Sequence, residues 1–338
     1  MNQAPYQLLT RHPDLLTANT LILTSESETD PAWLAMVRSA GCRVQTWDWR
    51  CYQVMLAALG EDKVTFAIPE VELPDNTERV IIVWPKAKQL AIALVQMLTR
   101  IPAHRHLPEV WLVGSNDSGG KSINNAIKHL ADTMKHDSAR RCSLWSALLR
   151  PQQASFNWLA LAKATHYDGR DYLSLPGVFS QGSLDKGSEL LLAQLKPLHG
   201  NVLDLGCGSG LLGISQALRS TDINLTLADT DAFALRSSAL NAARMGVKAD
   251  IVASDGLGQV NGYFDTIISN PPFHAGKETD YQFAEQLFAN ARKQLRAGGK
   301  LWIVANRHLP YEEWAARCFS QVEEVATANG FKILRISH

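Results

Sequence analysis

The chain has 338 residues, of which 46% are hydrophobic and 20% are charged, and its 33 basic and 33 acidic residues cancel to a formal net charge of zero. This length predicts two domains, and the composition is that of a soluble globular protein. The zero net charge excludes a general electrostatic attraction to nucleic acid, so any RNA contact would depend on local basic segments. Segments of this kind lie at residues 85–88, 100–106 and 135–141.

The cysteines and the first residues bear on the cellular setting. The five cysteines show no metal-ligand spacing, which favours a reduced, cytoplasmic setting. Residues 1–5 lack the basic and apolar regions of a signal peptide, and the apolar stretches are interrupted by polar residues. We therefore expect a cytoplasmic protein with no membrane segment.

The first half of the chain alternates apolar segments with helical ones. Pro31 after Asp30 is a typical helix start, and Gly41 is a typical helix stop. Such alternation implies parallel β-α-β units. Strands are predicted at residues 20–24, 43–49, 64–68, 79–84, 109–113 and 140–149, and helices at 31–40, 52–59, 89–100 and 122–134.

One segment of the first half is similar to a phosphate-binding loop. Residues 114–122 read Gly-Ser-Asn-Asp-Ser-Gly-Gly-Lys-Ser, and the spacing is one residue too long because Gly120, not Lys121, follows Gly119. A phosphate-binding loop needs its lysine at a fixed place. We therefore interpret the segment as a glycine-rich turn between a strand and a helix.

Residues 164–187 differ in character from the segments on either side. They are rich in glycine, serine, aspartate and aromatic residues and have no sustained period. This composition is too aromatic for a flexible linker. We expect a connecting segment that docks on the second half and covers part of a site.

The second half predicts another α/β unit. Asn329-Gly330 is a strong hairpin turn, so the last two strands are expected to be antiparallel. Both halves together predict an α/β fold with mostly parallel sheets flanked by helices. Strands are expected at residues 201–205, 225–229, 249–253, 264–269, 300–305, 322–328 and 331–336, and helices at 188–195, 211–218, 234–245, 280–295 and 311–319.

A glycine loop follows the first strand of the second half. Gly206, Gly208 and Gly210 let the backbone approach a bulky cofactor, and the helix behind them favours an electron-rich group. Alone, this pattern would equally suit a dinucleotide fold. Asp204, just ahead of the glycines, could hold the positive amino group of an amino-acid moiety.

Two further acids follow the next two strands. Asp229 could accept hydrogen bonds from both ribose hydroxyls, and Asp255 could accept one from the adenine 6-amino group. Each acid alone could equally be a helix cap. With the glycine loop and Asp204, however, they describe a ligand that has both a ribose and an aminocarboxylate. This ligand is S-adenosylmethionine rather than NAD, and no metal is implied.

The sequence Asn270-Pro271-Pro272-Phe273 ends the strand at residues 264–269. Two prolines cannot donate to a sheet ladder, so the chain must turn at the carboxyl end of the strand, where α/β sheets bind ligands. We expect this segment to be catalytic. The Asn270 amide, the two proline carbonyls and the Phe273 ring would be held together there, and this arrangement suits a flat group with an exocyclic NH2. Phe273 alone could also be a core residue.

These motifs resemble those of a known family. Residues 202–213 look like the first motif of class I S-adenosylmethionine methyltransferases, and residues 270–273 look like the motif of those that methylate planar nitrogens. The longer segments Phe-Ser-Gln-Gly-Ser-Leu-Asp-Lys-Gly-Ser (179–188) and Ile-Ser-Asn-Pro-Pro-Phe-His (268–274) resemble the bacterial ribosomal RNA small subunit methyltransferase C family. The resemblance covers essentially the full length.

The resemblance implies two tandem Rossmann-like class I methyltransferase domains, of which the N-terminal one is degenerate. The implied activity is methyl transfer from S-adenosylmethionine to N2 of a guanine in 16S rRNA, within the small ribosomal subunit. Phe179 and Asn270 are then expected to contact the cofactor, and His274 the guanine. The Asn270 side-chain oxygen and the Pro271 carbonyl would accept hydrogen bonds from the guanine NH2, and Phe273 would stack on the flipped base. Modification of 23S rRNA, methylation of a glutamine N5 in a protein, and a non-catalytic RNA-binding assembly factor remain as alternatives.

The expected domains are residues 1–163, a connecting segment at 164–187 that contributes to the site, and a catalytic domain at 188–338. After Leu23 the first half reads Thr-Ser-Glu-Ser-Glu where the second half has glycines. We therefore expect no cofactor in the first domain, and a role for it in RNA binding or in stabilising the second. The protein is expected to act as a monomer.

Overall fold

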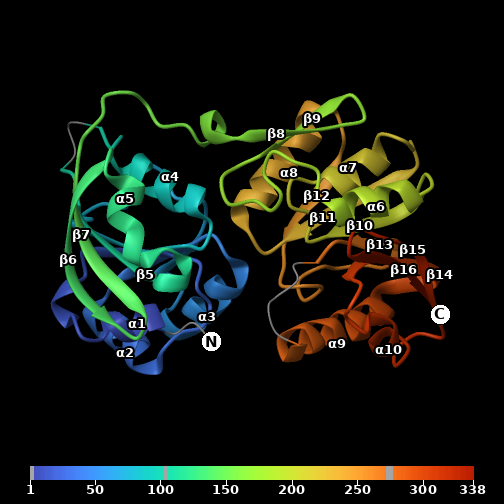
Figure 1. The fold of residues 1–338 in the computed structure, drawn as a ribbon, viewed down its shortest axis with the longest axis horizontal. Helices are drawn as coiled ribbons and strands as arrows, with labels where there is room; N and C mark the ends of the chain where they lie inside the picture. Colours follow the sequence, from blue (N-terminus) through green and yellow to red (C-terminus); the bar gives the residue numbers. More distant parts are fainter. Residues whose placement is uncertain (1–3, 103–105, 272–276) are drawn as a thin grey trace. The chain divides into compact units, whose positions relative to one another are not determined.

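The computed structural model describes residues 4–102, 106–271 and 277–338 of the chain. The chain divides into two compact units, residues 1–161 and 162–338 (Figure 1). Each unit is built around a seven-stranded sheet in which five strands are parallel to their neighbours and the last two are antiparallel.

The sheet of the first unit has the order β3-β2-β1-β4-β5-β7-β6. Its strands are β1 (Thr20–Thr24), β2 (Arg43–Thr46), β3 (Val64–Phe66), β4 (Arg79–Val83), β5 (Glu109–Ser115), β6 (Ala131–Ala139) and β7 (Cys142–Leu149). Its helices are α1 (Ala4–Leu9), α2 (Pro31–Ala40), α3 (Trp49–Leu59), α4 (Lys88–Leu98) and α5 (Ile123–Ile127).

The sheet of the second unit has the order β12-β11-β10-β13-β14-β16-β15, which is the same order when β10 is matched to β1. The prediction of two tandem copies of one α/β fold is confirmed. The strands are β10 (Gly200–Leu205), β11 (Ile223–Asp229), β12 (Ala249–Ala253), β13 (Phe264–Ser269), β14 (Leu295–Asn306), β15 (Gln321–Ala328) and β16 (Phe331–Ser337). The helices are α6 (Lys186–Gln194), α7 (Leu211–Ala217), α8 (Ala232–Arg244), α9 (Lys277–Gln294) and α10 (Tyr311–Ala315).

One sequence-based expectation about secondary structure is wrong, and one hairpin was not predicted. The helix expected at residues 122–134 ends at Ile127, and β6 begins at Ala131 and pairs with β7 through a turn in which Arg140 and Arg141 have positive φ. The connecting segment contains a two-stranded hairpin, β8 (Lys163–Tyr167) and β9 (Arg170–Ser174), around Asp168-Gly169. Aspartate and glycine are the residues that such a turn favours, so the signal was present in the sequence.

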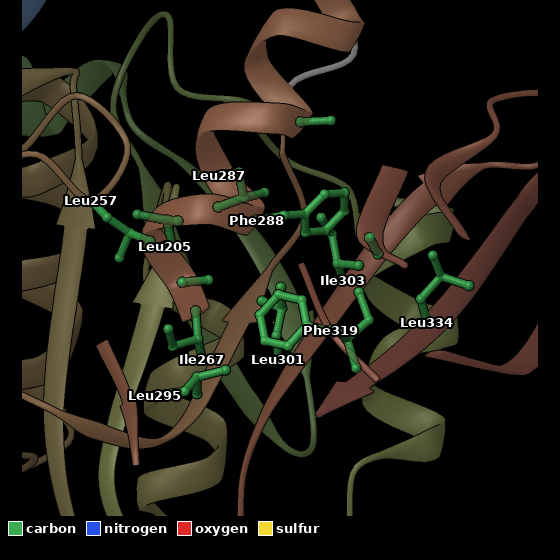
Figure 2. Close-up of a cluster of buried hydrophobic side chains, with 14 of the residues drawn as sticks. Leu205, Leu257, Ile267, Leu287, Phe288, Leu295, Leu301, Ile303, Phe319 and Leu334 are labelled. Atoms are coloured by element: carbon green, nitrogen blue, oxygen red, sulfur yellow. The ribbon is translucent and has the colours of Figure 1, made fainter. Parts of the chain in front are cut away.

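Side chains alternate between two hydrophobic clusters on the two faces of the second sheet, because successive residues of a strand point to opposite faces. One cluster includes Leu205, Ile267 and Ile303 and is closed by Leu287 and Phe288 of α9 (Figure 2). The other includes their sequence neighbours Ile268 and Val304 and is closed by α6, α7 and α8. The sheet is therefore buried on both faces, and its carboxyl edge is left to form the site.

Helix α7 packs closely on the sheet at Gly213. A Cβ added there would lie 2.8 Å from Leu227 Cδ2 and 2.9 Å from both Asp204 Cβ and Leu225 Cδ1. We expect Gly213→Ala to lower the free energy of unfolding by about 1–2 kcal/mol, because overpacking of about 1–3 kcal/mol outweighs a gain in helix propensity of about 1 kcal/mol. Thermal unfolding would measure this, and an unchanged or higher Tm would contradict the close packing.

Candidate active site

The carboxyl ends of four neighbouring strands bring the predicted site residues to one edge of the second sheet. In the register, Leu205 of β10 lies beside Ala228 of β11 and Ser269 of β13, and Asp229 lies beside Ala253 of β12. The residues that follow these positions are the glycine loop, Asp229 itself, Asn270 and Asp255. Ligands of open α/β sheets bind at this edge.

The glycine loop has the backbone that only glycine adopts without strain. Gly206, Gly208 and Gly210 have φ values of 72°, 56° and 78°. A Cβ on Gly206 would meet nothing within 4 Å, so this glycine faces open space, whereas one on Gly210 would lie 2.7 Å from Ile214 Cδ1. The first glycine therefore leaves room for a ligand and the last lets α7 begin close behind it.

Asp229 is tied to the loop and to the next helix. Its Oδ2 accepts a hydrogen bond from the Gly208 amide at 2.9 Å, and its Oδ1 accepts one from the Asp231 amide at 3.0 Å. In the first unit Thr46 ends β2 in the same way, is fully buried, and accepts a hydrogen bond from the Asp48 amide at 3.1 Å. The second unit thus has a half-buried carboxylate where the first has a buried hydroxyl.

Asp255 lies on an exposed turn after β12. Its amide donates to Gln259 Oε1 at 2.9 Å, and Ser254 before it is buried and donates to the Gly256 carbonyl. Because Asp229 pairs with Ala253, Asp255 follows at the same edge of the sheet, one strand further out.

Asp204 lies inside the unit and is fully buried. Its Oδ2 accepts a hydrogen bond from the Gly213 amide at 2.8 Å, and its Oδ1 is buried with no hydrogen-bond partner among the described residues. The pKa of Asp204 is raised to about 7, mainly by burial; the Gly213 amide opposes the rise, and the nearby charge of Asp229 contributes to it. In this structure Asp204 anchors the first turn of α7.

The raised pKa of Asp204 predicts a pH dependence of stability. Below about pH 4 the carboxyl is protonated in both the folded and the unfolded chain; between pH 4 and 7 only the folded chain keeps the proton. The contribution of Asp204 to the free energy of unfolding therefore falls as the pH rises from about 4 to about 7. We expect the Tm difference between Asp204→Asn and the wild type to shift in favour of the variant from pH 5 to pH 8, because Asn cannot ionise. Parallel Tm profiles over this range would contradict the raised pKa.

Asn270 is held by two residues, Asp185 and Ser188, whose place in the site was not predicted from the sequence. Its Nδ2 donates to Asp185 Oδ2 at 2.8 Å and to Ser188 Oγ at 2.9 Å. Asp185 also caps α6, since the same Oδ2 accepts the Ser188 amide at 2.9 Å. The capping pattern Asp-x-x-Ser is visible in the sequence, but the contact with Asn270 spans 85 residues and has no local signal.

The connecting segment is joined to the second unit beside the glycine loop. Asn241 of α8 exchanges two hydrogen bonds with the backbone of Leu173, at 2.9 and 2.8 Å, and donates a third to the Ser209 carbonyl at 2.9 Å. Val178 Cγ1 lies 3.9 Å from the Cβ position of Gly208, and the next residue, Phe179, is 65% exposed. The segment therefore lies beside the loop, and Phe179 faces solvent.

Pro272, Phe273 and His274 lie outside the described residues, so their predicted roles remain predictions. Within the described ranges, no group of three or more histidine, cysteine, aspartate or glutamate side chains could hold a metal ion. Among the same residues, no helix is long and apolar enough to cross a membrane.

Comparison with known proteins identifies related chains. Residues 170–335 match the family model of the methyltransferase small domain, and residues 6–164 match that of its N-terminal domain. The ribosomal RNA small subunit methyltransferase C of Cronobacter sakazakii is 35% identical over 97% of this chain and 95% of the relative. The protein of the same name from Klebsiella pneumoniae is 36% identical with the same coverage.

Among solved structures, the 16S rRNA N2 G1207 methyltransferase of T. thermophilus, in complex with AdoMet and guanosine, aligns with a TM-score of 0.77. The alignment covers 96% of this chain and 91% of that one at 22% identity. A likeness at this identity shows that the two chains share their fold.

Proposed function

This chain belongs to the ribosomal RNA small subunit methyltransferase C family, and from this premise we propose that it transfers a methyl group from S-adenosylmethionine to the exocyclic N2 of a guanine in 16S rRNA. One observation carries the proposal beyond the family. The register places Leu205, which precedes the glycine loop, beside Ser269, which precedes Asn270. A cofactor on the loop and an amino group on Asn270 would thus be neighbours.

The residues at the edge fit the cofactor. Gly206 leaves open space, and the Asp229 carboxylate is oriented by two backbone amides at the tip of β11, as recognition of a ribose requires. Asp255 stands one strand further out, where an adenine amino group would lie. S-adenosylmethionine, when bound, supplies an electrophilic methyl group on its sulfonium.

The acceptor half of the site is formed by Asn270 and Pro271. Asn270 Oδ1 and the Pro271 carbonyl each accept a hydrogen bond from one N–H group of the guanine amino group. These two hydrogen bonds hold the nitrogen lone pair toward the methyl group. In the transfer, the bond from the guanine nitrogen to the methyl carbon would form as the bond from that carbon to the sulfonium sulfur breaks, with the neutral thioether as the leaving group. The nitrogen would become positive, and both oxygens would stabilise its charge until one N–H proton passes to water. Position and electrostatics then supply the catalysis.

The proposed function is tested by methylation of unmodified 16S rRNA, 23S rRNA and assembled small subunits with labelled cofactor, followed by primer extension. We expect one guanine of 16S rRNA to be modified. Label found only in 23S rRNA or in protein would overturn the assignment of the substrate.

We further propose that the substrate is the assembled small subunit, in the cytoplasm, and that the protein is a monomer.

We propose that the first unit binds RNA or stabilises the second and binds no cofactor. RNA binding is supported by the hairpin β6–β7, on which Lys135, Arg140 and Arg141 are exposed. The proposal that no cofactor binds is supported by the sequence after β1, which has no glycines at residues 25–28. Removal of residues 1–161 should then weaken binding to 16S rRNA or reduce solubility. If both are unchanged, the proposed role is wrong.

A further inference from the structure

We propose that Asp185 and Ser188 are positioning residues for methyl transfer, which fix the orientation of the Asn270 amide so that its Oδ1 faces the amino group of the substrate. This inference rests on the proposed function and deepens it. It starts from the two hydrogen bonds of Asn270 Nδ2, to Asp185 Oδ2 at 2.8 Å and to Ser188 Oγ at 2.9 Å.

The two hydrogen bonds decide which way the amide lies. The oxygen and nitrogen of an asparagine side chain are assigned from their partners. A carboxylate only accepts hydrogen bonds, so the atom of Asn270 that contacts Asp185 must be the nitrogen. Both hydrogens of Nδ2 are then used by α6, and Oδ1 is the atom left to accept from a ligand. An amide turned by 180° would present a donor to the substrate NH2, which is itself a donor.

The start of α6 is built to hold this pair beside the sheet. Gly187 lies between the two residues and is buried, and a Cβ there would be 2.7 Å from Val304 Cγ1 and 3.1 Å from Asp185 Oδ2. A larger residue would push the helix start away from β14. The glycine therefore keeps the Asp185 carboxylate and the Ser188 hydroxyl within reach of Asn270.

Helix capping alone does not account for the arrangement. A cap needs one oxygen on the Ser188 amide, and Asp185 Oδ2 provides it at 2.9 Å. The same oxygen also accepts from Asn270, and the Ser188 hydroxyl adds a second contact to the same nitrogen. In the first unit Trp84 follows β4 in the place of Asn270, and an indole has no carbonyl to orient.

A carboxylate behind the amide also affects the chemistry. Charge-assisted hydrogen bonds are the stronger ones, and neighbouring bonds polarise each other. The Asp185 charge draws the Nδ2 hydrogens and makes Oδ1 a better acceptor. This effect grows as the guanine nitrogen becomes positive in the transition state, so it should appear in kcat rather than in substrate binding.

The kinetic test uses Asp185→Ser in the full-length protein. Serine caps a helix about as well as aspartate, but its side chain is shorter and carries no charge. We expect kcat to fall by about 10- to 100-fold, while KM for the RNA and Kd for S-adenosylmethionine change by less than about threefold. Asp185→Ser combined with Asn270→Ala should be no slower than Asn270→Ala alone, because both act through one amide. Ser188→Ala keeps the cap and should show a smaller loss in kcat.

The matched control is Asp30→Ser. Asp30 caps α2 in the first unit, where it accepts the Ala32 and Trp33 amides at 2.9 and 3.1 Å. The Asp30→Ser variant should change Tm about as much as Asp185→Ser does, and it should leave kcat unchanged. A kcat for Asp185→Ser within about twofold of the wild type, or losses that multiply in the double variant, would overturn the inference.

A second measurement does not depend on activity. Nuclear magnetic resonance of the protein with labelled asparagine, assigned with Asn270→Ala, should show Asn270 NH2 hydrogens that exchange slowly with water. Exchange should become faster in Asp185→Ser and in Ser188→Ala. If the wild-type hydrogens exchange as fast as the side-chain NH2 hydrogens of the exposed Asn76, the inference is wrong whatever the substrate is. Wild-type protein that shows slow exchange but no transfer to rRNA would instead refute the proposed function.

Discussion

Asn270→Ala is expected to reduce methyl transfer to 16S rRNA by about 100- to 1000-fold, as the loss of one preorganised transition-state contact does in other enzymes. In the proposed site, the variant would remove the Oδ1 acceptor, whose amide is held through Nδ2 by Asp185 and Ser188, and would leave the guanine amino group with the Pro271 carbonyl alone. Single-turnover transfer from labelled S-adenosylmethionine measures the chemical step directly.

The variant should still bind the cofactor, because the glycine loop and Asp229 lie on β10 and β11 and do not depend on the Asn270 side chain. Calorimetry with S-adenosylmethionine would show this. Asn224→Ala is the matched control: Asn224 lies near the amino end of β11 and bonds Asn201 at 3.1 Å, so transfer should be unchanged. Transfer by Asn270→Ala within about tenfold of the wild type would exclude the proposed role.

The sequence predicted those parts of the site that local chemistry determines. The sequence has two prolines after Asn270, and β13 ends at Ser269; glycines with positive φ follow β10. The positions of Asn270 and of the loop could therefore be predicted directly. Parallel strands bring their carboxyl ends together whatever lies between them. The relation between Asn270, the loop and Asp229 therefore followed from the order of the strands alone.

What the sequence did not predict depends on contacts between distant segments. Strand β6 is mostly polar and exposed, so only its pairing with β7 makes it a strand rather than a continuation of α5. The hydrogen bonds from Asn241 to the connecting segment and from Asn270 to Asp185 join residues 68 and 85 positions apart. No local pattern encodes such pairs, whereas comparison of the two halves would have revealed β6 through its counterpart β15.

The segment at residues 114–122 shows why one residue of spacing matters. The structure has two short 3-10 turns there, and Trp145 Nε1 donates to the Gly120 carbonyl at 2.9 Å. A Cβ on Gly120 would lie 2.1 Å from the Gly114 carbonyl oxygen. The second glycine is therefore required by packing within the turn, in agreement with the structural interpretation of this segment.

Asp229→Ala should weaken the binding of S-adenosylmethionine by about 100-fold or more, or about 2.7 kcal/mol. Two contributions are lost together. Hydrogen bonds between a carboxylate and ribose hydroxyls are of the charged class, with about 1.5–3 kcal/mol each. The Gly208 amide also loses the acceptor at 2.9 Å that fixes the glycine loop. Calorimetric titration of the variant measures the change in Kd.

The same titration tests whether the first unit has lost its cofactor site. The wild type should bind one S-adenosylmethionine per chain, because β1 is followed by Ser25 and Glu26 where β10 is followed by glycines, and because buried Thr46 stands where Asp229 does. Thr46→Val is the matched control and should leave both Kd and stoichiometry unchanged. Two binding events in the wild type, of which Asp229→Ala removes one, would show that the first unit still binds the cofactor. A single binding event in the wild type, with an unchanged Kd in Asp229→Ala, would show that the ribose does not bind at the end of β11.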